Sequence, residues 1–233
     1  MRTITLAGPA KNALGSSLMQ SVHDQVKAAS GEPLLLTGDG DAFSAGLNLK
    51  EVLNADDDSM RAFHHLLEET IAALYHYPGP TAAAVNGHAI AGGAILALVC
   101  DRRIATTNAK ARIGLNEVAL GLQFPPRLLG MVTDCIPRRH QIEVLLGAGL
   151  FGPQDSLRLG LVDAVADDPV AEATAWLKTC GSHPDGAYAA GKAQLRPPIP
   201  LTDAQKVHFD TVVLPGWTSE SVKTRIGGFF TKK

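Results

Sequence analysis

The sequence is poor in aromatic residues and holds no long hydrophobic run. Aromatic side chains make up 5% of its 233 residues, so a core built from its 45% hydrophobic content must rely on Leu, Val, Ile and Ala. No apolar run reaches the ~18–20 residues of a membrane-spanning helix, so no membrane association is expected. The 21 basic and 23 acidic residues give a formal charge of −2, which indicates no basic surface for nucleic acid.

Cysteine is also scarce, and its spacing excludes two kinds of cross-link. Cys100, Cys135 and Cys180 are odd in number and far apart, and no C-x-x-C pair occurs. Neither a disulfide framework nor a zinc site is therefore indicated, which favours a reducing compartment. The N-terminus lacks the charged-then-apolar pattern of a signal peptide, so we expect a cytoplasmic protein without a bound metal.

Strand and helix patterns alternate along the first 165 residues. Strands are predicted at 2–6, 33–37, 81–85, 101–106, 111–113 and 161–165, and helices at 14–29, 59–77, 92–99, 138–146, 153–159 and from about 127. This alternation predicts an α/β fold with largely buried sheets. From Pro169 onward the pattern is helical, and no internal repeat of about 20–50 residues is visible.

The most informative segment is 86–101, with the sequence NGHAIAGGAILALVCD. It is a run of very small residues, Ala89 to Ala94, followed by an apolar stretch typical of a buried helix. A helix that begins near Gly92 points its free N–H groups at any ligand bound there. Where the bound anion exists only in the transition state, such a site is an oxyanion hole. Taken alone, the segment fits a tightly packed Gly/Ala turn equally well.

Two further segments complete a pattern. They are 42–50, AFSAGLNLK, and 113–121, IGLNEVALG. In order and spacing the three segments resemble the crotonase family, the enoyl-CoA hydratases and isomerases, from about Ile4 to about Val165. The motifs FSAGL, AGG and GLNE are most similar to those of the Δ3,Δ2-enoyl-CoA isomerases. The resemblance implies a spiral of β-β-α turns over 1–165, followed by a helical region, 166–233, that covers the pocket and builds a homotrimer or a dimer of trimers.

Glu117 is the candidate catalytic residue. Its neighbours in the segment are mostly apolar, and a poorly solvated carboxylate has a raised pKa and is a stronger base. Composition alone favours a surface glutamate on a turn. The resemblance favours a catalytic role for Glu117, because the family carries its catalytic glutamate in the GLNE motif.

Ile95 occupies the position at which many hydratases of the family carry a second glutamate, just inside the helix after the Gly-Gly turn. Hydration needs both an activated water and a proton donor, and the hydratases share this work between two carboxylates. A double-bond shift needs one base that removes a proton from C2 and returns it at C4. The sequence therefore predicts an isomerase that converts 3-enoyl-CoA to 2-enoyl-CoA in the β-oxidation of unsaturated fatty acids.

The resemblance also assigns the remaining site residues. The backbone N–H groups of Leu47 and Gly92 would form the oxyanion hole on the thioester oxygen. No cofactor is implied, because CoA is part of the substrate. Lys11 and Lys50 are candidates for the CoA phosphates, although each also fits a solvated surface lysine. The predicted substrate-binding residues are Ala45, Gly46, Asn48, Leu49, Gly93 and Asn116.

Several alternatives stay open at this point. The same fold supports hydratases, hydrolases and decarboxylases, so fold alone cannot separate these reactions. His88 could supply a second acid, although a packed or capping histidine is the simpler interpretation. A catalytically idle CoA-binding or assembly protein is a further alternative, against which Glu117 argues. His64, His65, Glu68 and Glu69 have helical spacing, which fits either a metal site or a salt-bridged helix face.

Overall fold

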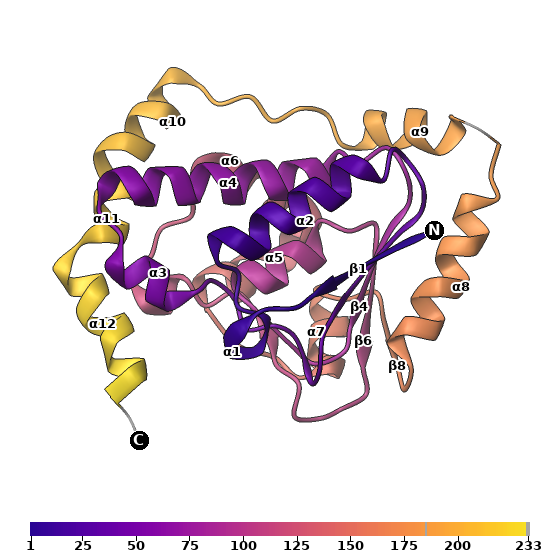
Figure 1. Cartoon of the computed structure of the whole chain (residues 1–233), viewed down its shortest axis with the longest axis horizontal. Coiled ribbons are helices and arrows are strands. Elements are labelled where there is room, and N and C mark those ends of the chain that lie inside the picture. Colours follow the sequence, from indigo (N-terminus) through magenta and orange to yellow (C-terminus); the bar gives the residue numbers. More distant parts are fainter. Residues whose placement is uncertain (185, 232–233) are drawn as a thin grey trace.

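The chain folds around two parallel sheets, in a computed structural model that describes residues 1–184 and 186–231 (Figure 1). The larger sheet has the order β1-β2-β4-β6-β8 and the smaller one the order β3-β5-β7, and every pairing in both is parallel. The strands are β1 (Arg2–Leu6), β2 (Leu34–Gly38), β3 (Ala42–Ser44), β4 (Thr81–Val85), β5 (His88–Ile90), β6 (Arg102–Thr106), β7 (Ile113–Gly114) and β8 (Ala164–Ala166).

Helices cover both faces of the larger sheet. The main core lies between the sheet and α2, α4 and α5, and α8 packs on the opposite face (Figure 1). This two-sided cover explains why β2 and β4, in the middle of the sheet, are largely apolar. The helices are α1 (Pro9–Asn12), α2 (Ser16–Ala28), α3 (Leu49–Asn54), α4 (Asp57–Tyr75), α5 (Gly92–Leu98), η1 (Val118–Leu120), α6 (Pro126–Cys135), η2 (Arg138–His140), η3 (Ile142–Leu146), α7 (Pro153–Leu159), α8 (Pro169–Gly181), α9 (Ala187–Leu195), α10 (Asp203–His208), η4 (Phe209–Val213), α11 (Leu214–Thr218) and α12 (Glu220–Thr231).

Three successive turns of the chain repeat one pattern. Each places a strand in the larger sheet, then a strand in the smaller sheet, then helix: β2-β3-α3-α4, β4-β5-α5 and β6-β7-η1-α6. The predicted α/β spiral of β-β-α turns is therefore confirmed. The repeat is invisible in the sequence because the inserted helices differ in length, with 19 residues in α4 and 7 in α5.

Several local predictions were wrong. The strands β3 and β5 and the helix α3 were not predicted, because three to six residues are too few to show a period. The predicted helix 138–146 is two short turns, η2 and η3, instead of one α-helix. Helix α4 begins at Asp57 rather than after Ser59, because Asp56 is the N-cap and forms a capping box with Ser59.

The helices after β8 run back along the body of the protein. Figure 1 shows α10, α11 and α12 beside α4 and α3, and α11 and α12 contact those two helices. The division into 1–165 and 166–233 stays a prediction, and its last two residues lie outside the described part of the chain. Over the described residues, no helix is long and apolar enough to cross a membrane.

An aromatic cage joins α4 to the C-terminal helices. The His64 ring, 1% exposed, lies edge-on to Phe63, to Phe209 and to Trp217, with ring centroids 6.4, 5.8 and 4.5 Å away. Among the described residues neither His64 ring nitrogen has a hydrogen-bond partner. Burial lowers the pKa of His64 to about 4, so the ring is neutral at neutral pH.

Acid is expected to weaken this cage. The unfolded chain binds a proton on His64 near pH ~6.5, well above the folded pKa, so stability falls as the pH drops from about 6.5 to about 4. At about pH 4.5 the expected loss from this group is about 2–3 kcal/mol. Urea unfolding at about pH 6.5 and about pH 4.5 should show a smaller loss of unfolding free energy for His64→Phe than for the wild-type protein. The exposed His183→Phe should behave as wild type, and equal losses in all three proteins would contradict the assignment.

Candidate active site

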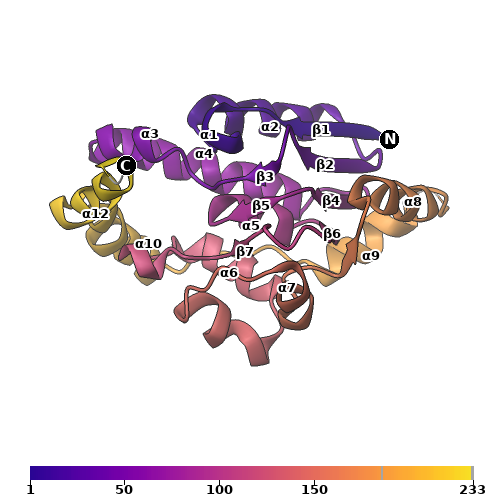
Figure 2. The same ribbon diagram turned by 90° about the horizontal axis from the view of Figure 1, so that it is seen from below.

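The smaller sheet brings the three sequence segments to one edge. Its strands β3, β5 and β7 are parallel neighbours, so their carboxyl ends lie at the same side (Figure 2). The segments that follow these ends are 45–48, 91–93 and 115–117. Ligands of parallel sheets bind outside the carboxyl ends of the strands. The structure therefore assembles one candidate site from three parts of the chain.

The first two segments are in van der Waals contact. Gly46 has φ +97°, and a Cβ atom added there would lie 2.8 Å from the carbonyl oxygen of Ile90. A Cβ added to Gly92 would lie 2.8 Å from Cδ2 of Leu47. Glycine is required at position 46, because its φ is positive and a Cβ would meet backbone, whereas a side chain at position 92 would displace only the end of Leu47.

The backbone N–H groups of Leu47 and Gly92 are among those without protein partners at this contact. Within the described part of the chain, neither the N–H of Leu47 nor that of Gly92 donates a hydrogen bond to another residue. Gly92 is the first residue of α5, and the first N–H groups of a helix have no partner inside it. Ala91, which precedes it, has φ +48° and donates to the carbonyl of Gly114 at 2.9 Å. That bond ties the second segment to the third.

Glu117 follows at the end of the third segment. Its side chain is 5% exposed, and its Oε2 atom has no hydrogen-bond partner among the described residues. Burial raises the pKa of Glu117 to about 7. The carbonyl of Glu117 accepts from the N–H groups of Leu120 and Leu122 at 3.0 and 2.9 Å, so the backbone beside this carboxyl group is fixed. Such a group is a base of useful strength near neutral pH.

The neighbouring asparagines differ in what they do. Asn116 has a buried side-chain oxygen without a partner in the described chain, next to Glu117. Asn48 is already engaged, because its Oδ1 accepts from the Lys50 N–H and its Nδ2 donates to Glu51. Leu49 begins the helix that Asn48 caps. The side chain of Asn48 is therefore a helix cap.

The two predicted phosphate ligands are surface lysines. The ammonium of Lys11 lies 2.8 Å from Asp41, in an exposed pair. Lys50 is exposed in the first turn of α3. Lys11 would have to exchange Asp41 for a phosphate, whereas Lys50 has no ion pair within the described residues.

The structure also shows the positions of Ile95 and His88, the two residues considered for a second catalytic acid. Ile95 is 2% exposed inside α5 and belongs to the main core. His88 begins β5, whereas Gly92 follows the other end of that strand. The Nδ1 atom of His88 accepts the N–H of Arg112 at 3.2 Å, so it is unprotonated in this arrangement.

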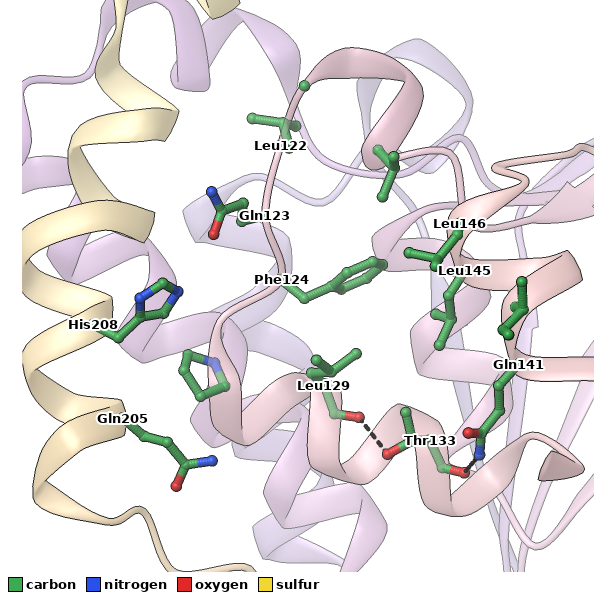
Figure 3. Close-up of a pocket in the computed structure, with 14 residues that line it drawn as sticks. Leu122, Gln123, Phe124, Leu129, Thr133, Gln141, Leu145, Leu146, Gln205 and His208 are labelled. Atoms are coloured by element: carbon green, nitrogen blue, oxygen red, sulfur yellow. Dashed lines mark hydrogen bonds between the residues drawn. The ribbon is translucent and has the colours of Figure 1, made fainter.

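A cavity of about 720 Å³ is lined by residues that follow Glu117 in the chain, from Val118 to Phe124, and by residues of later helices (Figure 3). Val118 and Leu122 line its near side, whereas Glu117 itself does not line it. Its wall is mostly apolar, and Phe124 points across it toward Leu145 and Leu146. Gln205 and His208 of α10 close the opposite side.

No metal centre is found among the described residues, where no group of three or more His, Cys, Asp or Glu side chains converges. The predicted cluster on α4 is dispersed. His64 lies in the aromatic cage, and Glu69 pairs with Arg127 at 2.9 Å.

The chain is similar to known proteins of one family. The model of the enoyl-CoA hydratase/isomerase family matches residues 1–232. The mitochondrial enoyl-CoA delta isomerase 1 of Homo sapiens is 32% identical over 170 residues, 70% of this chain and 55% of that protein. The crotonyl-CoA hydratase of Syntrophomonas wolfei is 34% identical over 168 residues, 67% of this chain and 61% of that protein. The matched segments thus span less than two thirds of either relative.

A solved structure extends the likeness over the whole chain. The crystal structure of human mitochondrial delta3-delta2-enoyl-CoA isomerase superposes with a TM-score of 0.87 at 25% identity, covering 98% of this chain and 92% of that one. This likeness covers the two-sheet spiral and the C-terminal helices alike. The predicted resemblance is therefore confirmed, and the chain belongs to the enoyl-CoA hydratase/isomerase family with the crotonase fold.

Proposed function

We propose that this protein is a Δ3,Δ2-enoyl-CoA isomerase with Glu117 as its single base. The observation that carries the proposal is the buried carboxyl group of Glu117, whose Oε2 has no partner among the described residues, at the sheet edge that also holds the N–H groups of Leu47 and Gly92. Ile95 fills the place of the second glutamate with an aliphatic core side chain. A site with one such base is suited to moving a proton within the substrate.

The reaction needs two proton transfers through one carboxylate. Glu117 removes a proton from C2 of the 3-enoyl thioester, and the electron pair moves toward the thioester oxygen to form a dienolate. The N–H groups of Leu47 and Gly92 stabilise that oxygen, and each such donor contributes about 3 kcal/mol to the transition state. The protonated Glu117 then returns the proton to C4, which leaves the double bond between C2 and C3. No atom is gained or lost.

The rest of the substrate would extend on both sides of this centre. We place the CoA moiety along 45–49, with Lys50 and Lys11 near its phosphates. The acyl chain would enter the cavity that begins at Val118, because its wall is apolar. A homotrimer or a dimer of trimers belongs to this proposal by family resemblance.

The decisive assay follows conversion of a 3-enoyl-CoA to its conjugated 2-enoyl isomer, with hydration of a 2-enoyl-CoA measured in parallel. Isomerisation with negligible hydration supports the proposal. Efficient hydration by the wild-type protein would overturn it.

Hydration is the second candidate because a relative of equal similarity is a crotonyl-CoA hydratase. This reaction requires a second acid that Ile95 cannot supply. His88 is poorly placed for the role, since it lies at the far end of β5 and its Nδ1 already accepts a hydrogen bond. A His88→Gln variant that loses hydration but keeps its fold would support the hydratase reading instead.

The pH dependence of isomerisation should report the burial of Glu117. A base works only when deprotonated, so kcat/KM is expected to rise about tenfold per pH unit below the pKa and to level off above about pH 7. Initial rates between about pH 5 and pH 9 test this. A midpoint near the ordinary glutamate pKa of ~4.3 would contradict the assignment.

A further inference from the structure

The segment 10–12 adopts a conformation that its residues disfavour. Ala10, Lys11 and Asn12 have φ values of 51°, 61° and 60°, in the left-handed region. Non-glycine residues visit this region singly and at a steric cost, so three in succession must be held by their surroundings. Strain of this kind gathers at functional sites.

The turn is held by the segment that contains Leu47. The Asn12 side chain is 3% exposed, and its Nδ2 donates to the carbonyls of Asp39 and Ala42, each at 2.9 Å. The carbonyl of Asn12 accepts the hydroxyl of Ser44 at 2.8 Å. The left-handed turn thus directs both the side chain and the carbonyl of Asn12 at β3 and the residues beside it.

The backbone N–H groups on either side of Leu47 all donate hydrogen bonds, whereas that of Leu47 does not. Ala45 donates to the carbonyl of Lys11 at 2.9 Å, Gly46 donates to the Ser44 hydroxyl at 3.3 Å, and Asn48 donates to the carbonyl of Leu14 at 3.0 Å. Among residues 45–48, within the described chain, only the Leu47 N–H is left without a partner. The turn therefore fixes where this N–H points.

Ser44 also contacts the other half of the site. It is fully buried, and a Cβ added to Gly93 would lie 2.5 Å from its carbonyl oxygen and 2.7 Å from its Cβ. Gly93 follows Gly92 at the start of α5. Ser44 therefore lies between the turn 10–12 and the N-terminus of α5, in contact with both.

We propose that Asn12 and Ser44 are positioning residues, which hold the Leu47 N–H in register with the Gly92 N–H through the left-handed turn 10–12. This inference rests on the proposed function of those two groups as the oxyanion hole. A loss of register is expected to affect the transition state more than substrate binding, because the dienolate oxygen is the atom that these donors serve.

The test compares two buried serines. Ser44→Ala removes the hydroxyl that joins Asn12 to Gly46. Ser156→Ala is the matched control, because Ser156 is equally buried and donates to the carbonyl of Gly152 at 2.8 Å within α7. Ser44→Ala is expected to lower kcat about 10–100-fold with KM changed less than about threefold, and Ser156→Ala to leave kcat unchanged.

Two further variants separate position from fold. Asn12→Asp keeps the shape but turns a donor into an acceptor opposite two carbonyls, so it should lower kcat as Ser44→Ala does. Ala10→Gly relieves strain at an exposed position without removing a side-chain hydrogen bond, so Tm should rise by about 2 °C.

A second readout does not depend on turnover. The infrared C=O stretch of a bound, carbonyl-labelled 2-enoyl-CoA shifts when the oxyanion donors polarise it. The shift should be present in wild type and Ser156→Ala and reduced in Ser44→Ala. Equal kcat and equal shifts in both serine variants would overturn the positioning roles. Wild-type hydration in place of isomerisation would overturn only the proposed reaction, because both reactions use the same two donors.

Discussion

Replacing Glu117 by glutamine is expected to lower kcat for isomerisation by about 10³–10⁴-fold, because the amide can neither remove the C2 proton nor return one at C4. The substitution preserves the size of the side chain, so the affinity for a CoA ester should change by less than about threefold. The measurement is the rate of 3-enoyl-CoA conversion, together with ligand binding by calorimetry. Glu172→Gln, an exposed change on α8, is the control for removal of one carboxylate.

The same substitution is expected to stabilise the fold at alkaline pH. The pKa of Glu117 is raised to about 7 in the folded state, so the folded chain holds its proton more tightly than the unfolded chain does. Between about pH 4.5 and pH 7 this group therefore lowers stability as the pH rises, by about 3–4 kcal/mol in full. Glu117→Gln should unfold at higher urea than wild type at pH ~8 and at similar urea near pH ~4.5.

These two results together separate a catalytic carboxylate from a structural one. A glutamate that only supported the fold would, when replaced, cost stability and activity together. A gain in stability with a loss of turnover is the pattern of a group held in a costly environment for its chemistry. If Glu117→Gln turned over at the wild-type rate, the single-base mechanism would be wrong.

The residues of the candidate site could be named from the sequence, whereas the way the fold brings them together could not. Glu117, Leu47 and Gly92 each lie in a short motif whose wording marks them. The strands β3 and β5, which bring those motifs together, have three residues each and show no alternation. The sequence therefore reveals the three motifs and their order, but not the sheet edge at which they meet.

Asn12 and Ser44 show a second limit of sequence reasoning. In segment 10–12 the sequence indicated only Lys11, as a candidate for the CoA phosphates, and no residue there except Asn12 favours a left-handed turn. Their conformation is imposed by bonds to residues about 30 positions away. Contacts of this kind depend on the tertiary fold and leave no local pattern.

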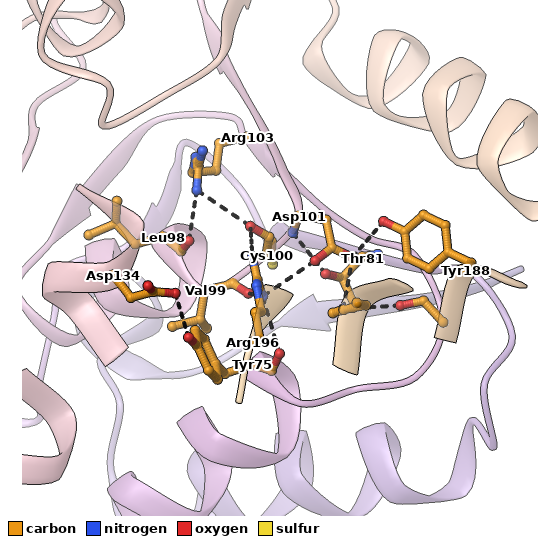
Figure 4. Close-up of polar contacts among 12 residues, drawn as sticks. Tyr75, Thr81, Leu98, Val99, Cys100, Asp101, Arg103, Asp134, Tyr188 and Arg196 are labelled. Carbon is orange, nitrogen blue, oxygen red and sulfur yellow. Dashed lines mark hydrogen bonds and ion pairs between the residues drawn. The ribbon is translucent and has the colours of Figure 1, made fainter. Parts of the chain in front are cut away.

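The polar contacts that hold α9 to the core could not be predicted from the sequence either, because the residues that form them are far apart in the chain. The carboxylate of Asp101, after α5, lies 2.8 Å from the ammonium of Lys192 and 3.3 Å from the guanidinium of Arg196 (Figure 4). The Tyr188 hydroxyl donates to Asp101 at 3.0 Å. Arg196 also donates to the carbonyl of Val99, at the end of α5, at 2.6 Å. One carboxylate thus ties α9 and the residue after it to the core.

Burial makes this network sensitive to the loss of one member. The side chains of Asp101, Lys192 and Arg196 are 10%, 7% and 14% exposed. The pKa of Lys192 is lowered, because desolvation by burial outweighs its attraction to Asp101. The network therefore contributes less stability than its short distances imply. Removing the Asp101 carboxylate would nevertheless be costly, because Lys192 and Arg196 would stay buried as unpaired charges.

Asp101→Ala is accordingly expected to lower the free energy of unfolding by about 3–5 kcal/mol, since it leaves two buried cations without a counter-charge. Urea unfolding measures the loss, and limited proteolysis should show earlier cleavage around α9. Asp155→Ala, which breaks the exposed pair with Arg158, should cost under about 1 kcal/mol.

A double-mutant cycle distinguishes an unpaired charge from a general defect in packing. Lys192→Met removes one of the two cations, so Asp101→Ala should cost less in that background than in the wild type, by at least about 1 kcal/mol. Equal costs in both backgrounds would show that Lys192 and Asp101 act independently. The coupling would then have to be sought between Asp101 and Arg196, whose guanidinium also satisfies the carbonyls of Tyr75 and Val99. A residual cost in Lys192→Met is expected for that reason, because Arg196 stays at the ends of α4 and α5 without its carboxylate.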